Sequence, residues 1–159
     1  MDHDSIREAR IEDIPMIVEM IRAGSSEGVF HSRNLSLEEQ REGFRKYVFE
    51  NRPVGYQILV YQSGSTAVGY VDYRVRRGVG HILGIYVKRS YRRRGIGKRL
   101  IGRALDDFMK GGCHKTRLEV FAYNHGAMNF YKHLNFVQEG FLHKDEEKKD
   151  TVIMSKFLP

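Results

Sequence analysis

The stretch from Val87 to Arg99 constrains the fold of this chain more than any other part of its sequence. An apolar, strand-like pattern ends at Val87, and an amphipathic helical pattern begins at about Gly97. A basic loop that contains Gly95 and Gly97 separates the two patterns. A further strand pattern covers residues 116–121, so strand, helix and strand follow one another as in a parallel crossover. The sequence therefore predicts an α/β fold with a central βαβ unit.

The rest of the chain also alternates between strand and helix patterns. Residues 12–23 carry an apolar stripe with helical spacing, which Asp13 can cap and whose first turn tolerates Pro15. Ser36 and Glu39 form a capping-box pattern at the start of a second helix. The order β-α-α-β-β-β-α-β-α-β-β predicts a mixed sheet of about seven strands with flanking helices. The expected strands are 6–9, 56–61, 67–75, 81–87, 116–121, 136–142 and 151–157, and the expected helices are 12–23, 36–50, 97–110 and 124–134.

Composition narrows the class of protein. The chain has 159 residues, of which 41% are hydrophobic, and no linker-like stretch divides it, so we expect one domain spanning residues 1–159. The single cysteine, Cys113, excludes an internal disulfide. The sequence shows neither a signal-peptide pattern nor an apolar run of membrane-spanning length. We therefore expect a cytoplasmic protein without a membrane partner.

The charge balance favours an anionic partner. The chain carries 27 Lys and Arg residues against 20 Asp and Glu residues, which gives a formal net charge of +7 at pH 7. Such an excess attracts nucleic acid, acidic membrane surfaces and phosphorylated small molecules alike. Net charge does not distinguish among these partners, whereas the position of the charges around the glycine loop does.

The glycine loop has the chemistry of a phosphate-binding site. A helix N-terminus presents unpaired N–H groups, and Gly95 and Gly97 let a ligand approach the backbone closely. Basic side chains between Arg89 and Arg99 add full positive charges around the same point. The Walker pattern and the dinucleotide-binding fingerprint are both absent. From the loop alone, pyrophosphate binding and contact with nucleic-acid phosphates both stay open.

Two motifs together resemble the GNAT superfamily of N-acyltransferases. Arg92-x-x-Gly95-x-Gly97 after an apolar strand is similar to the acyl-CoA loop of that family. The second match, at the family's spacing, consists of Leu118-Glu119-Val120, Asn124-x-x-Ala127, Phe130-Tyr131 and Asn135-Phe136. The resemblance covers most of the chain from Gln57 onward. It implies a GNAT-like fold and an N-acetyltransferase that uses acetyl-CoA as its co-substrate.

The resemblance also implies a coenzyme site. Amides from Arg93 to Lys98 would hold the pyrophosphate, and the strand at residues 85–87 would pair with the pantetheine arm. The amide of Tyr86 or Val87 would polarise the acetyl carbonyl. Asn124 would cap its helix and bond the coenzyme arm. The residues implied in cofactor binding are Ile85, Tyr86, Val87, Arg92, Arg93, Arg94, Gly95, Ile96, Gly97, Lys98, Asn124 and Tyr131.

Glu119 and Tyr131 are the candidate catalytic residues. Glu119 interrupts an apolar strand, where burial would raise its pKa toward a value useful for a general base. A glutamate on the solvent-exposed face of the strand, paired with a neighbouring arginine, would also explain a charged residue between Leu118 and Val120. The resemblance to ribosomal-protein alanine N-acetyltransferases, which place a catalytic Glu in this segment, favours the base. By resemblance Tyr131 would protonate the departing thiolate, although it also fits the core stripe of an amphipathic helix.

Other polar residues leave further alternatives. His81 begins the strand that would carry the coenzyme, and it either relays a proton through water or is an exposed strand-end residue. The His, Cys and acidic residues lack metal-ligand spacing, so the sequence predicts no metal site.

The expected acceptor is a primary amine, and the match at Glu119, Asn124 and Tyr131 favours a protein N-terminal α-amino group. That subgroup usually carries a paired-tyrosine segment, but His143-Lys144-Asp145 stands in its place here. Small amines, polyamines and lysine side chains therefore stay open as acceptors. We expect residues 25–34 and 143–150 to form the acceptor loops.

Two other function classes stay open beside the transferase. A basic nucleic-acid-binding module would use the same arginines, although their concentration around two glycines favours a compact phosphate ligand over nucleic acid. An acyl-CoA sensor would keep the coenzyme site without catalysis. The sequence does not decide the oligomeric state, and a homodimer is among the options.

Overall fold

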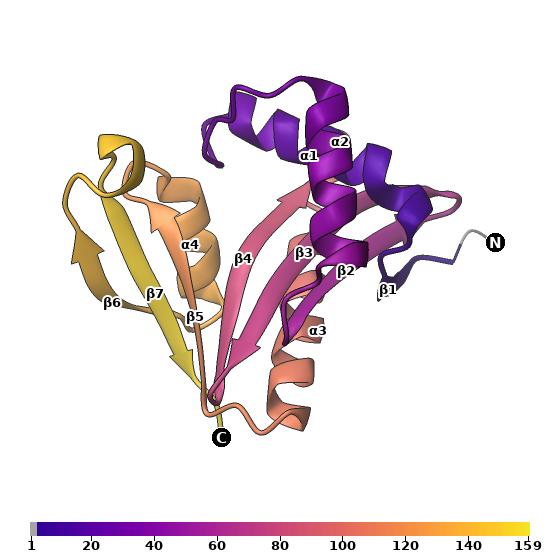
Figure 1. The fold of residues 1–159 in the computed structure, drawn as a ribbon. Helices are drawn as coiled ribbons and strands as arrows, with labels where there is room; N and C mark the ends of the chain where they lie inside the picture. The colour runs from indigo at the N-terminus through magenta and orange to yellow at the C-terminus, as the bar shows by residue number, and fades with distance from the viewer. Residues whose placement is uncertain (1–2) are drawn as a thin grey trace.

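One mixed sheet with helices on both of its faces is the framework of the protein. The computed structural model describes residues 3–159, and α1 and α2 lie on the opposite side of the sheet from α3 and α4 (Figure 1). The strands are β1 (Ser5–Glu8), β2 (Tyr56–Ser63), β3 (Thr66–Arg76), β4 (Val79–Val87), β5 (Lys115–Phe121), β6 (Val137–Leu142) and β7 (Thr151–Phe157). The helices are α1 (Ile14–Ser26), α2 (Leu37–Arg45), α3 (Ile96–Lys110) and α4 (His125–His133).

The strand order confirms the predicted crossover. The seven strands lie in the order β1-β2-β3-β4-β5-β7-β6. Neighbouring strands are antiparallel except β4 and β5, which run parallel and are joined by α3. The order of strands and helices along the chain is also the predicted one. Among the described residues, no helix is long and apolar enough to cross a membrane.

The two parallel strands stay paired over only half of their length. Val79–Ile82 of β4 pairs with Lys115–Leu118 of β5, and beyond these residues the strands separate (Figure 1). The register between β3 and β4 shifts at the same point, because Asp72 lies opposite Gly84 while the next residue lies opposite Ile82. The shift leaves an extra residue in β4, and a bulge of this kind bends a strand away from its course. Residues 83–87 of β4 therefore have no partner strand on the β5 side.

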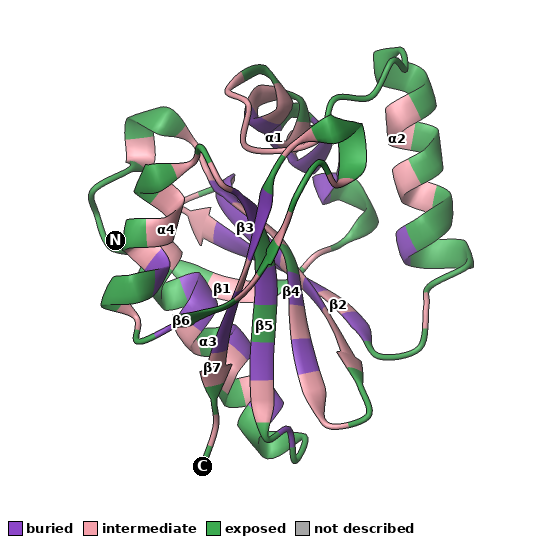
Figure 2. Cartoon of the chain, turned by 90° about the vertical axis from the view of Figure 1, so that its left-hand side faces the viewer, coloured by how far each residue is buried: buried purple, intermediate pink, exposed green. Residues whose placement is uncertain are grey.

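An apolar core lies on each face of the sheet. On one face α3 contributes Leu100, Ile101 and Phe108, each at most 1% exposed, to a core shared with β2 to β5. On the other face α1 contributes Ile17 and Met20, which are equally buried. Figure 2 shows buried and exposed positions alternating along β5, as the two-residue period of a strand requires.

Asp13 does not cap α1 as expected. Its carboxylate accepts hydrogen bonds from the guanidinium of Arg7, at 2.7 and 3.0 Å, and from the amide of Arg10, at 2.7 Å. The side chain thus ties β1 to the start of the first helix. A cationic partner across the chain competes successfully for a carboxylate that would otherwise bond its own helix.

The second expected helix is divided into two segments. Ser36 and Glu39 form the predicted capping box, in which the hydroxyl accepts from the Glu39 amide at 3.2 Å and the carboxylate from the Ser36 amide at 2.7 Å. The α-helical hydrogen bonding ends at Arg45, and a π-helical turn follows over Lys46–Glu50.

Candidate active site

The loop before α3 presents a row of backbone amides without internal partners. Gly95 adopts a φ of +77° at the start of α3, a left-handed conformation that glycine accepts without strain. Within residues 3–159, no protein group accepts a hydrogen bond from the amides of residues 93–98. These amides and the positive end of the helix dipole are therefore available to an anion.

Two of the basic side chains brace this loop. Arg92 donates from Nε to the carbonyl oxygen of Val87 at 2.9 Å. Arg94 donates to the carbonyl oxygen of Ser90 at 3.2 Å, and its guanidinium lies 5.0 Å from the centre of the Tyr91 ring. These contacts hold the loop in shape, so the two arginines orient the amides as well as adding charge.

Glu27 connects the loop to the end of α1. Its carboxylate accepts hydrogen bonds from Nη2 of Arg92 at 2.8 Å and from the hydroxyl of Tyr86 at 2.9 Å. Burial opposes its ionisation, but these hydrogen bonds hold the pKa of Glu27 below its ordinary value. Sequence reasoning missed this residue, because it lies 65 positions before Arg92 in the chain.

The part of β4 that does not pair with β5 has two backbone amides that face the gap between these strands. The amide of Lys88 bonds the carbonyl of Val68 on β3 at 2.9 Å. Because amides alternate in direction along a strand, the Tyr86 amide also faces β3, while those of Ile85 and Val87 face away from it. Of the two expected candidates, the Tyr86 amide is thus directed to β3, and only the Val87 amide faces the gap.

Tyr131 and Asn124 lie on α4 as the sequence predicts. Asn124 caps the helix, since its Oδ1 accepts from the amide of Ala127 at 3.1 Å. Tyr131 is 6% exposed and packs against the rings of Phe130 and Phe136. Within the described part of the chain its hydroxyl has no hydrogen-bond partner, yet it is not sealed from solvent. Burial raises the pKa of the Tyr131 phenol well above its usual value, so the group carries its proton at neutral pH.

Glu119 is exposed, contrary to the expectation of a buried glutamate. Its neighbours Leu118 and Val120 point into the core and are 3% and 8% exposed, so alternation sends Glu119 to the other face of β5. That face is open at β5, because α1 covers only the strands nearer to the N-terminus. Burial therefore does not activate Glu119. It follows Leu118, the last residue of β5 that pairs with β4, and so lies beside the gap between these two strands.

Comparison with known proteins agrees with this geometry. The acetyltransferase (GNAT) family matches residues 22–136. A thialysine N-epsilon-acetyltransferase of Mus musculus is 34% identical over 139 residues, which cover 81% of each chain. The chain belongs to the GNAT acetyltransferase family. This assignment confirms the predicted acetyl-CoA-dependent N-acetyltransferase.

Two further relatives extend the comparison. An N-alpha-acetyltransferase of Saccharolobus solfataricus is 28% identical and covers 83% of this chain and 79% of its own. The crystal structure of the PaiA N-acetyltransferase of Thermoplasma acidophilum in complex with coenzyme A superposes with a TM-score of 0.74 at 24% identity. It covers 98% of this chain and 99% of that one. The GNAT fold is thus established, whereas the relatives differ in acceptor.

The expected acceptor loops of this GNAT acetyltransferase meet above the end of β5. His31, in the loop after α1, lies 3.4 Å from Glu146 and 3.5 Å from Glu147 of the β6–β7 hairpin. Its ring also packs edge-on against Phe121 at 4.8 Å. Next to it the hydroxyl of Tyr123 donates to the carbonyl of Gly28 at 2.6 Å. The two loops therefore form a bridge across one side of the site.

His81 lies at the paired end of β4, away from the gap. Its Nδ1 accepts a hydrogen bond from Nε of Arg117 at 3.1 Å. Burial lowers the pKa of His81, and the charges of Arg117, Arg76 and Arg74 lower it further, so the imidazole is neutral at neutral pH. This position does not bring the ring to the end of β4 where the free amides lie.

Asp72 is a candidate functional residue that sequence reasoning missed in this acetyltransferase. It lies on β3 opposite Gly84, at the register shift of β4. Burial raises the pKa of Asp72 to about 6, against the hydrogen bond from Tyr56 and two backbone amides, which favour the ionised form. An aspartate inside the strand pattern Val71-Asp72-Tyr73 is the signal that was available, since charged residues are costly within a covered strand.

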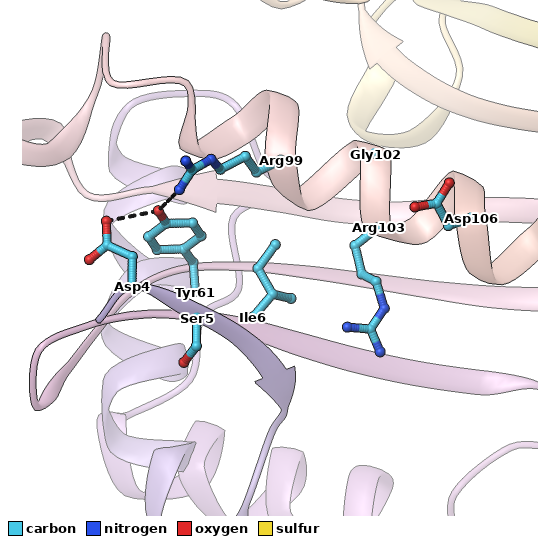
Figure 3. Close-up of a pocket in the computed structure, with 8 residues that line it drawn as sticks. All are labelled: Asp4, Ser5, Ile6, Tyr61, Arg99, Gly102, Arg103 and Asp106. Carbon is cyan, nitrogen blue, oxygen red and sulfur yellow. Dashed lines mark hydrogen bonds between the residues drawn. The ribbon is translucent and has the colours of Figure 1, made fainter. Parts of the chain in front are cut away.

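A separate pocket of about 470 Å³ lies between the N-terminal strands and α3 (Figure 3). There the hydroxyl of Tyr61 donates to Asp4 at 3.0 Å and accepts from Arg99 at 2.6 Å. Arg103 and Asp106 also line it. None of the predicted site residues belongs to this pocket, and its central groups are already bonded to one another.

Proposed function

We propose that the protein transfers the acetyl group of acetyl-CoA to a primary amine by direct attack within a ternary complex. The observation that carries the proposal is the continuity between the free amides of residues 93–98 and the unpaired end of β4. The first suits a pyrophosphate at a helix N-terminus. The second offers an extended edge along which an amide-containing arm can bond as an added strand.

The amide of Val87 supports polarisation of the acetyl carbonyl. It faces away from β3, and an N–H fixed in direction stabilises the negative charge that develops on a carbonyl oxygen during attack. Ile85 faces the same way and is available to the pantetheine arm. Arg93 and Lys98 are exposed beside the free amides and add charge for the pyrophosphate.

Tyr131 supports departure of the thiolate. Its protonated and unpartnered hydroxyl donates a hydrogen bond, and finally a proton, to the sulfur as the carbon–sulfur bond breaks. The attacking nitrogen must lose two protons overall when it arrives as an ammonium. The resemblance to ribosomal-protein alanine N-acetyltransferases supports Glu119 as the acceptor of one of them, and its exposed carboxylate beside the gap would act together with solvent.

We propose a protein N-terminal α-amino group as the acceptor. The N-alpha-acetyltransferase relative supports it. An α-amino group has a pKa near 8, so about a tenth of it is neutral at neutral pH, far more than of a lysine-like amine. The contact of His31 with Glu146 and Glu147 of the β6–β7 hairpin favours a second candidate, a compact cationic amine. The joined loops would leave less space on this side of the site for a polypeptide acceptor. The thialysine N-epsilon-acetyltransferase relative supports this alternative.

A panel of acceptors tests the function. Acetyl-CoA turnover is measured with N-terminal peptides, thialysine, spermidine and a lysine-containing peptide, and the product is identified by mass spectrometry. We expect one class to react at least about tenfold faster in kcat/KM than the others. Binding of CoA without turnover on any amine would instead support an acyl-CoA sensor.

A further inference from the structure

Asp72 lies on the sheet face that α1 covers, beside the bulge at which β4 leaves β5. Its Oδ2 accepts a hydrogen bond from the hydroxyl of Tyr56 at 2.9 Å. A Cβ atom placed on Gly84 would lie 3.0 Å from Oδ1 of Asp72 and 3.3 Å from the Tyr70 hydroxyl. Any other residue at position 84 would therefore crowd the carboxylate, so this close approach of β4 to Asp72 favours glycine.

The charge of Asp72 has no cationic partner in the part of the chain that the structure describes. Among residues 3–159, no lysine, arginine or histidine nitrogen lies within 4.0 Å of its carboxylate. Its neighbours are the backbone amides of Asp72 and Gly84, the neutral hydroxyls of Tyr56 and Tyr70, and the ring of Phe30, which packs on Tyr70. Asp72 is half-buried, and an ionised carboxylate that loses part of its hydration costs free energy when no positive charge lies nearby. The arrangement fits an ammonium group, which is what an amine acceptor carries at neutral pH.

The protonation chemistry of Asp72 agrees with this geometry. With a pKa raised by burial to about 6, the carboxylate is ionised at neutral pH, yet it holds a proton more readily than an exposed aspartate does. Tyrosine and arginine side chains ordinarily titrate far above this pH. The titratable and charged groups around Asp72 are Tyr56 on β2, Tyr47 packed on Tyr56, Tyr70 on β3, and Arg33, whose charge acts on Tyr70.

We propose that Asp72 receives the ammonium group of the acceptor and takes its first proton, so that the amine attacks from the α1 face of the sheet. The inference rests on the proposed acetyl transfer. One proton passes from the acceptor nitrogen to a carboxylate oxygen of Asp72. The nitrogen lone pair then forms the bond to the acetyl carbon as the carbon–sulfur bond breaks. The nitrogen loses its second proton to Glu119 and, through it, to solvent, the thiolate gains one, and Asp72 returns its proton to solvent.

Three substitutions test this assignment with spermidine and an N-terminal peptide as acceptors. Asp72→Asn should lower kcat/KM for the amine about 100-fold, leave the Kd of CoA within about twofold, and abolish an acid limb of the rate profile near pH 6. Tyr56→Phe removes the donor that favours the ionised carboxylate, so it should move this limb to higher pH. Asp106→Asn changes an exposed carboxylate on α3 in the same way and should behave as the wild type. Thermal unfolding and CoA binding confirm that each variant is folded.

The outcomes separate the inference from the proposed function. An active wild type whose Asp72→Asn variant keeps its rate and its acid limb overturns the role of Asp72 alone. Loss of the limb in Glu119→Gln, with the limb retained in Asp72→Asn, assigns the proton to Glu119 and also overturns it. A wild type that binds CoA but acetylates no amine overturns the proposed function, and the Asp72 assignment with it.

Discussion

At the scale of single residues, two acidic side chains within strands have opposite environments. Glu119 on β5 is exposed, because its alternation places it on a face that no helix covers. Asp72 on β3 is largely shielded, because α1 and the loop after it cover the corresponding face. The residue type and the apolar sequence neighbours are similar in both cases. Burial therefore distinguishes the two carboxylates, and burial depends on what packs above each strand.

The raised pKa of Asp72 predicts a pH-dependent stability. The native state holds the proton more tightly than the unfolded chain, whose aspartate has a pKa near 3.8. The stabilisation is therefore complete below that value and is lost as the pH rises through about 6. Relative to Asp72→Asn, the wild type should lose up to about 3 kcal/mol of unfolding free energy between about pH 4 and pH 8. Urea unfolding of both proteins across this range measures the difference, and a constant difference would contradict it.

The hydroxyl of Tyr131 should matter for rate and not for stability. Since it has no partner among the described residues, Tyr131→Phe should change the free energy of unfolding by less than about 0.5 kcal/mol. The same change should lower kcat about 100-fold without altering the KM for acetyl-CoA. Tyr61→Phe is the matched control, because it removes hydrogen bonds to Asp4 and Arg99 and should reduce stability while leaving kcat unchanged. Equal kcat values in the wild type and Tyr131→Phe would remove Tyr131 from the mechanism.

At the scale of elements, the βαβ unit of β4, α3 and β5 contains the features on which the proposed function rests. The bulge in β4 ends its pairing with β5, and Gly95 turns the chain into α3. The free amides of the loop and of the strand end therefore lie on one continuous stretch of chain. Arg92 fixes the loop by bonding both the strand carbonyl of Val87 and Glu27 at the end of α1.

Two glycines of this unit should respond in opposite ways to alanine. Gly95 has a φ of +77°, so Gly95→Ala should cost about 1 kcal/mol of unfolding free energy. Gly102 lies inside α3 with ordinary helical geometry and open space around its Cα, so Gly102→Ala should stabilise the protein by about 0.5–1 kcal/mol. Chemical unfolding of both variants measures the effects. A stabilising Gly95→Ala would show that the left-handed turn is not retained in solution.

At the scale of the whole molecule, the loops after α1 and between β6 and β7 come together from opposite ends of the sequence. His31 and the acidic pair Glu146 and Glu147 form the contact over Phe121. The acceptor side of the site is thus shaped by segments that flank the βαβ unit on either side. The chain as a whole has a formal net charge of +7, and this charge by itself would attract many polyanions.

Specific ligand binding should separate the transferase from a nucleic-acid module. CoA at about 100 times its Kd should stabilise the native state by about 2.7 kcal/mol, which for a chain of this size raises the Tm by about 5–10 °C. Duplex DNA at the same phosphate concentration and high salt should leave the Tm unchanged, because contacts to scattered surface charges are screened. Differential scanning fluorimetry measures both. A shift with DNA but none with CoA would favour the nucleic-acid interpretation.

The sequence determined the periodic part of this protein. Apolar spacing predicted the order of the helices and strands, and the Ser36 and Asn124 caps marked helix starts. The strand–glycine–helix pattern located the amides without internal partners. These features depend on residues close together in the chain, where backbone geometry and side-chain type act locally.

Tertiary structure alone decided which of these groups are available and which are buried. The pairing of β4 with β3 directs the Tyr86 amide to β3 and leaves the Val87 amide facing the gap. The helix α1 covers one face of the sheet and so gives Asp72 the shielded environment that was expected of Glu119. Alternation along a strand says that neighbouring side chains point in opposite directions, but it does not say which direction another element covers. That answer depends on contacts between segments far apart in the sequence, for which a local pattern carries no signal.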